Sequence, residues 1–158
     1  MFRILTRKKQ QISHSECISI LVQETRGVLS VNGDDGYPYA MPMNHFYNEE
    51  DGCIYFHCGK KGHRIDALRR DPKVSFCVYD SGYREEGRWA LNVRSVIVFG
   101  RVDIIDNIDE VVRITTRLCY KFTQDKEYID KEIKSCAGAT YLLKLIPENI
   151  CGKLVNES

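Results

Sequence analysis

This sequence has almost no excess of one sign of charge over the other. Its 158 residues include 23 Lys and Arg against 22 Asp and Glu, which leaves a formal net charge of +1. A nucleic-acid-binding domain normally carries a broad basic surface, and a chain this close to neutrality lacks the main electrostatic argument for one. We therefore expect no nucleic-acid partner, and any charged ligand must be held by a local cluster of side chains.

Long apolar runs are also missing. No stretch approaches the roughly 20 apolar residues that a membrane-spanning helix requires. The N-terminal MFRILTRKKQQ is basic but is not followed by the apolar segment of a signal peptide. The chain has no internal repeat or low-complexity tract, and its 43% apolar content is enough for one core. These features predict a single cytoplasmic domain over residues 1–158, with no membrane partner.

The cysteines include no CxxC pair. There are seven, Cys17, Cys53, Cys58, Cys77, Cys119, Cys136 and Cys151. An odd number in a chain of this size indicates reduced thiols that pack as small apolar groups. A zinc site is the alternative, because two cysteines and two histidines lie between residues 53 and 63. Their spacing does not match a closed tetrahedral site, so we predict no metal.

The most informative stretch runs from Ile54 to Phe76. A short strand pattern leads into a glycine-punctuated turn at 59–62, and helical spacing then continues to Asp71-Pro72. Free backbone N–H groups at a helix start favour an anion. Basic side chains gather at the same place, namely Lys60, Lys61, His63 and Arg64. The pattern indicates a phosphate site, although it is neither GxGxxG nor a Walker loop, and a solvated basic loop would have the same composition.

The order of strand and helix patterns favours a mostly β fold. Strand patterns recur along the whole chain, at 28–31, 37–47, 53–58, 74–79, 89–105 and 139–146. Helical patterns are fewer, at 13–24, 63–71, 107–122 and 125–135. A doubly wound sheet would need a helix after nearly every strand. We therefore predict a mostly antiparallel sheet curled into a small β-barrel, with peripheral helices.

Three residue positions predict irregular points in this sheet. Pro38 and Pro42 have no backbone N–H to donate to a neighbouring strand. The strand at 37–47 should therefore be bulged or lie at an edge of the sheet. Gly100 predicts a bulge or a bend in a curved sheet. Pro147 is expected to end the last strand.

Several short motifs, in chain order, resemble those of a known superfamily. They are Arg7 with Gln11, Ser13–Glu16, Gly36–Tyr39, Pro42 with Asn44, Ile54–His57, Gly62–Asp66, Val74–Phe76, Ser95–Arg101 and Gly152-Lys153. Together they resemble the FMN-binding split-barrel superfamily, and within it the nitroimidazole-resistance (Nim) branch, which is related to pyridoxamine 5′-phosphate oxidases. The resemblance implies a homodimer of six-stranded antiparallel split barrels, with two FMN molecules at the subunit interface.

The resemblance also implies a set of cofactor-binding residues. Arg64 stands where the family has a phosphate-binding Lys or Arg, residues 43–45 would line the isoalloxazine ring, and Ser95 would approach the cofactor. The Asn44 amide offers the donor and the acceptor that a flavin's pyrimidine edge requires, unless it is an ordinary polar residue on a strand. The full set is Met43, Asn44, His45, His57, Cys58, Lys61, Gly62, His63, Arg64 and Ser95.

The function implied by the resemblance is that of an FMN-dependent oxidoreductase. NAD(P)H or another donor would supply electrons for a small acceptor such as a nitroaromatic, a quinone or oxygen. His45 and His57 are candidate catalytic proton donors, because an unperturbed imidazole titrates near neutrality. Oxidation of pyridoxamine phosphate is not expected, because the chain ends GKLVNES without the arginine and histidine motif of the true oxidases. The alternative is a non-enzymatic flavin or haem carrier or sensor.

Overall fold

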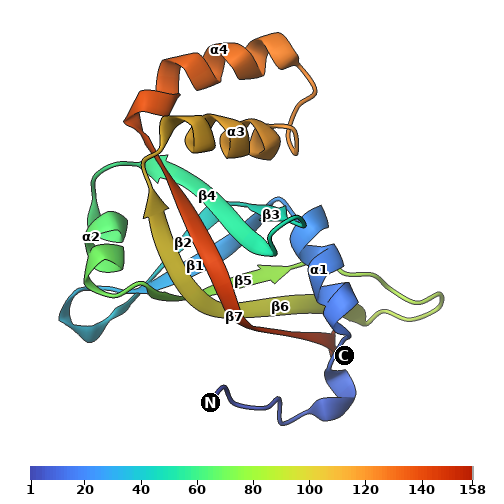
Figure 1. Ribbon diagram of the computed structural model, residues 1–158. Coiled ribbons are helices and arrows are strands. Elements are labelled where there is room, and N and C mark those ends of the chain that lie inside the picture. Colours follow the sequence, from blue (N-terminus) through green and yellow to red (C-terminus); the bar gives the residue numbers. More distant parts are fainter. Residues whose placement is uncertain (158) are drawn as a thin grey trace.

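Seven antiparallel strands form one curled sheet in the computed structural model, which describes residues 1–157 (Figure 1). The strands are β1 (Arg26–Asn32), β2 (Pro38–Asn44), β3 (Phe46–Asn48), β4 (Cys53–Gly59), β5 (Lys73–Tyr79), β6 (Leu91–Ile105) and β7 (Thr140–Glu157). Their order across the sheet is β2-β1-β5-β6-β7-β4-β3. β2 and β3 are therefore the two edges, yet only His45 separates them in the chain. The edges must meet at that residue, and this curls the sheet into a barrel.

Four α-helices lie within residues 1–157 and complete the fold. They are α1 (His14–Gln23), α2 (His63–Arg70), α3 (Ile108–Cys119) and α4 (Lys126–Cys136). Side chains cap the N-termini of α1, α3 and α4. The capping residues are Ser13, Asn107 and Asp125, whose side chains accept hydrogen bonds from backbone N–H groups in the first turn of each helix. Within the described residues, no helix combines the length and the apolar character needed to cross a membrane.

The predicted mostly β fold, with a curled antiparallel sheet and peripheral helices, is confirmed. The sheet has seven strands and not six, because the strand predicted over 37–47 breaks at His45 into β2 and β3. The edge position predicted from Pro38 and Pro42 is also confirmed, since β2 pairs only with β1. An edge strand tolerates proline because one row of its backbone groups has no ladder partner.

The two longest strands pair along nearly their whole length. β6 and β7 change register between Phe99 and Gly100, where Phe99 faces Asn149 but Gly100 faces Pro147. The bulge predicted at Gly100 is therefore confirmed. The predicted strand end at Pro147 is wrong, because β7 continues to Glu157. Proline is tolerated inside this strand because it lies at the bulge, where the regular ladder is interrupted.

Replacing Gly100 with alanine is expected to destabilise the protein by about 1–3 kcal/mol. A Cβ at this position would clash with the carbonyl oxygen of Ile146, so the paired strands would have to separate. Urea unfolding followed by circular dichroism measures the change in the free energy of unfolding. Gly138→Ala is the matched control, because a Cβ there meets nothing within 4 Å. Equal stability of the two variants would contradict the close approach of β6 to β7.

Two apolar cores share the barrel wall. The first fills the barrel and includes Ile54 and Phe56 of β4, together with buried residues of α1. The second lies outside the wall, where Cys53 and Tyr55 pack beneath α3 and α4. Neighbouring residues of β4 therefore face different cores, as the alternation of a strand requires. The helix pair covers this outer side of the barrel, at the top of Figure 1.

Candidate functional site

The alternation along β4 brings His57 to the edge of the second core. His57 shares the outward face of the strand with Cys53 and Tyr55, and it lies two residues beyond the part that α3 covers. The residue is partly accessible to water and lines a cavity of about 290 Å³ between the barrel and the two helices. Asn44, at the end of edge strand β2, lines the same cavity. Residues of two strands that are not neighbours in the sheet thus line one cavity.

The turn after β4 leads directly into α2. Gly62 is the N-cap of this helix with φ +118, and no side chain caps the first N–H groups. A left-handed backbone of this kind favours glycine. A Cβ on Gly59 or Gly62 would meet nothing within 4 Å, so the space outside the turn is open. An uncapped helix start beside open space is a suitable place for an anion.

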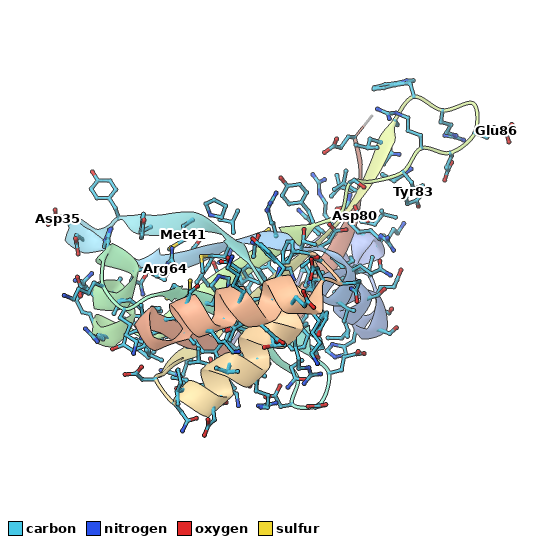
Figure 2. All side chains as sticks on the ribbon, turned by 90° about the horizontal axis from the view of Figure 1, so that it is seen from above. Asp35, Met41, Arg64, Asp80, Tyr83 and Glu86 are labelled. Atoms are coloured by element: carbon cyan, nitrogen blue, oxygen red, sulfur yellow. The ribbon has the colours of Figure 1, made fainter. Side chains whose placement is uncertain are left out.

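Arg64 is the half-buried cation at this helix start. Its Nε donates to the sulfur of Met41 at 2.9 Å, and Figure 2 shows the two side chains next to each other. Within residues 1–157, Arg64 forms no ion pair with a carboxylate. A thioether is a weak acceptor. The guanidinium therefore retains most of its capacity to bind an anion.

The other basic side chains of the turn divide into two groups. Lys60 forms an ion pair with Asp106. His63 stacks on Tyr39, with ring centroids 4.2 Å apart, and its Nε2 lies 3.4 Å from a carboxylate oxygen of Asp34. Lys61 is exposed and, like Arg64, has no carboxylate partner in the part of the chain that the structure describes. The cations free for a ligand are therefore Lys61 and Arg64.

Two ionisable groups at the end of β4 have shifted pKa values. Loss of surrounding water and the nearby Arg64 charge both lower the pKa of His57, so its imidazole is neutral at neutral pH. Burial raises the pKa of the Cys58 thiol, and this effect outweighs the opposing effect of Arg64. Cys58 is therefore a protonated thiol and not a reactive thiolate.

The structure brings most of the predicted site residues to one end of the barrel. Those at or near this end are Asn44, His57, Cys58, Lys61, Gly62, His63 and Arg64. Met43 is only 7% exposed and His45 is fully buried, so both side chains belong to the barrel interior. Ser95 lies elsewhere, on β6, where it lines a hollow with residues of the N-terminal segment.

Sequence reasoning missed Met41 and Thr115. Met41 is the sulfur partner of Arg64, and its inward position follows from alternation along β2. Thr115 lies on the buried side of α3 between Ile114 and Leu118 and lines the cavity. A polar residue within the apolar stripe of an amphipathic helix was the available signal.

A comparison with models of protein families shows the family to which this chain is related. The model of a family described as pyridoxamine 5′-phosphate oxidase matches residues 13–154. The chain belongs to this family. The match includes β4, the glycine turn, α2 and the α3–α4 pair, so every part of the candidate site lies within it. No curated protein matches the chain.

Solved structures share the fold of this family member at low sequence identity. A candidate 5-nitroimidazole antibiotic resistance protein from Bacteroides thetaiotaomicron has a TM-score of 0.77 and 21% identity, over 92% of this chain and 87% of that one. A FAD-binding protein from Mesorhizobium loti has a TM-score of 0.64 and 22% identity, over 92% and 97%. The FAD and heme binding protein from Mycobacterium smegmatis has a TM-score of 0.71 and 20% identity, over 94% and 74%. At this identity the likeness establishes the fold.

Proposed function

We propose that this protein is an FMN-dependent oxidoreductase that reduces a small acceptor, a nitroaromatic compound or another, as the resemblance to the Nim branch implies. The observation that carries the proposal is the free Arg64 guanidinium at the uncapped start of α2. In a chain of the pyridoxamine 5′-phosphate oxidase family, an anion site beside a cavity fits the phosphate of FMN. The names of related structures, which include flavin-binding proteins, support a flavin as the cofactor.

The residues present fit FMN in charge and in hydrogen bonding. Arg64, Lys61 and the first N–H groups of α2 would hold the phosphate. The ring would lie toward Asn44 and His57, at the opening of the cavity. The Oδ1 atom of Asn44 accepts from Nε of Arg26 at 3.1 Å, which orients the amide and leaves its NH₂ group to donate to a ligand.

Bound FMN would supply the redox chemistry between a reduced nicotinamide and a small acceptor such as a nitroaromatic, a quinone or oxygen. The chain itself supplies binding, orientation and a neutral imidazole at His57. A neutral imidazole donates one hydrogen bond and accepts another, so His57 would orient a ligand rather than act as an imidazolium acid. His45 is buried in the barrel and is not part of this proposal.

We also propose that the protein is a homodimer. Tyr79, Ile97 and Phe99 are exposed apolar residues on the outer face of β5 and β6, and Ser95 lies on the same face. A second copy packed on this face would cover them and could bring Ser95 to the cofactor of the partner. Sedimentation equilibrium tests this arrangement, and a monomer at micromolar concentration would count against it.

A haem carrier or sensor is the competing proposal. The observation in its favour is the exposed, neutral His57 at an open cavity, because a neutral imidazole is a common axial ligand of haem iron. The related protein from Mycobacterium smegmatis binds both FAD and heme, according to its name. The two proposals differ in chromophore and in turnover.

An absorption spectrum of the purified protein tests the proposed function. We expect a flavin spectrum, either at once or after addition of FMN, that bleaches when NADH or NADPH is added without oxygen. Re-oxidation by an added nitroaromatic or quinone would then establish turnover. A Soret band would favour the haem carrier. A protein that binds no FMN would contradict the phosphate assignment at Arg64.

A further inference from the structure

Thr115 has a buried hydroxyl without a hydrogen-bond partner. The residue is 8% exposed, and its Oγ1 is one of two buried side-chain polar atoms in the described residues that lack a partner. Its neighbour on α3 behaves differently, since the Thr116 hydroxyl donates to the carbonyl oxygen of Val112 at 2.7 Å. That bond is the usual one for a threonine within a helix. Thr115 is one of the residues that line the 290 Å³ cavity, and a ligand there that reached the hydroxyl would satisfy it.

The cavity around Thr115 is mainly apolar. Buried residues of the two helices form its walls, namely Val111, Leu118, Ile129 and Ile133. A cavity of about 150 Å³ with similar walls binds one benzene ring. The volume of about 290 Å³ is therefore suitable for a molecule with one or two rings. Asn44 and His57, toward which the flavin ring is proposed to lie, also line this cavity.

The charge of the cavity selects against anions. Glu132 at its rim is the one charged side chain among the described lining residues, and no Lys or Arg lines it. The pKa of the Cys119 thiol is raised, mainly by burial and further by the Glu132 carboxylate, which agrees with a negative potential at the rim. A carboxylate or a phosphate entering this space would lose water without gaining a counter-charge. The phosphate of FMN accordingly fits Arg64 and not this cavity.

We propose that the cavity between α3 and α4 binds the acceptor, and that it selects an uncharged molecule of one or two aromatic rings whose polar group accepts a hydrogen bond from Thr115. This inference rests on the proposed function, because it places the acceptor beside the flavin ring. The apolar walls hold the rings, the Thr115 hydroxyl fixes their orientation, and Glu132 excludes acids of the same size. Aromatic acceptors with a nitro or a quinone group satisfy all three conditions.

Fluorine NMR with two matched probes tests the site without requiring turnover. The probes are 4-fluoronitrobenzene, which is neutral, and 4-fluorobenzoate, which is similar in size but anionic. We expect saturable binding of the neutral probe and much weaker binding of the acid to the FMN-treated protein. Glu132→Gln should reduce this difference between the probes. Equal binding of both probes to the wild type, or no saturable binding of the neutral one, would overturn the proposal.

Variants on one helix provide the matched comparison. Thr115→Val keeps the side-chain shape and removes the hydroxyl, so affinity for 4-fluoronitrobenzene should fall by about threefold to tenfold. Thr116→Val is the control and should bind the probe like the wild type, because the Thr116 hydroxyl is already bonded to Val112. Ile133→Trp should fill the cavity and abolish binding of the probe. Thr115→Val decides the question on its own if the tryptophan variant does not fold.

Retention of FMN separates this inference from the proposed function. If Ile133→Trp loses the probe and keeps FMN, the acceptor site is supported. If it folds and loses FMN as well, the cavity belongs to the cofactor and the acceptor assignment is wrong. If the wild type binds the neutral probe through Thr115 but binds no FMN, the small-molecule site is supported and the FMN-dependent function fails. Unchanged probe binding in both Thr115→Val and Ile133→Trp would overturn the site itself.

Discussion

The Arg64→Ala variant is expected to bind FMN about tenfold to hundredfold more weakly than the wild type, because it loses a charge-assisted contact to the phosphate. The Arg64 guanidinium is half-buried and donates to the Met41 thioether, and no carboxylate of residues 1–157 pairs with it and competes with the ligand. Titration of apoprotein into FMN, followed by quenching of flavin fluorescence, measures the dissociation constant. The fold should persist, because the side chain is not part of either apolar core.

Lys60→Ala is the matched control for Arg64→Ala. It also removes a cation from the turn, but Lys60 is already paired with Asp106 and lies against the ring of Tyr141. We expect its FMN affinity to stay within a few-fold of the wild type. Arg64→Lys should lie between the wild type and the alanine variant, because a lysine keeps the charge without the planar fork of donors. Equal losses in Lys60→Ala and Arg64→Ala would indicate a general charge effect and not a phosphate contact at Arg64.

Local sequence signals predicted the elements around the candidate site. The glycine turn and the helix that follows it were visible because glycine, basic residues and helical spacing occur within one short stretch. The helix starts near Ser13 and Asp125 were predicted from local helical spacing in the same way. Gly100 could be interpreted as a bulge because an isolated glycine in a strand pattern has few other structural uses.

The break at His45 could not be predicted from the sequence. Residues 37–47 contain no interruption of the strand pattern at this point, and the break arises because the chain passes there from one edge of the sheet to the other. That transition depends on closure of the barrel, in which β4 pairs with β7 about 90 residues later in the chain. Contacts of this range leave no local signal. The continuation of β7 past Pro147 has the same origin, because its partner β6 extends equally far.

Alternation along β2 separates neighbouring residues that the resemblance placed together at the flavin ring. It implied that Met43, Asn44 and His45 all line the flavin ring. Adjacent side chains on a strand face opposite sides, so the side chains of Met43 and Asn44 face different surfaces. The structure buries Met43 in the barrel and turns Asn44 to the cavity. The same rule separates His57, which lines the cavity, from Cys58, which packs against the barrel core.

Lowering the pH from 6.5 to about 4 is expected to reduce the free energy of unfolding by about 3 kcal/mol through His45 alone. Burial and the nearby Lys121 charge lower the pKa of His45 from 6.5 to about 4. Its Nε2 donates to the carbonyl oxygen of Leu21 at 2.9 Å, and a second proton would enter at Nδ1, which is buried without a partner. Between these two pH values the unfolded chain binds the proton and the folded chain does not, so stability falls as the pH falls. Urea unfolding at a series of pH values measures this slope.

His45→Gln separates this effect from other acid-sensitive groups. Glutamine can donate to the Leu21 carbonyl through its amide, but it does not titrate, so the slope between pH 4.5 and 6.5 should become much flatter than in the wild type. Carboxylates with lowered pKa values, such as Asp51 and Asp71, act mainly below this window and should affect both proteins alike. A variant that keeps the wild-type slope would show that His45 is already protonated in the folded chain. The assignment of His45 as a buried, neutral imidazole would then be wrong. His45 would again be a candidate proton donor.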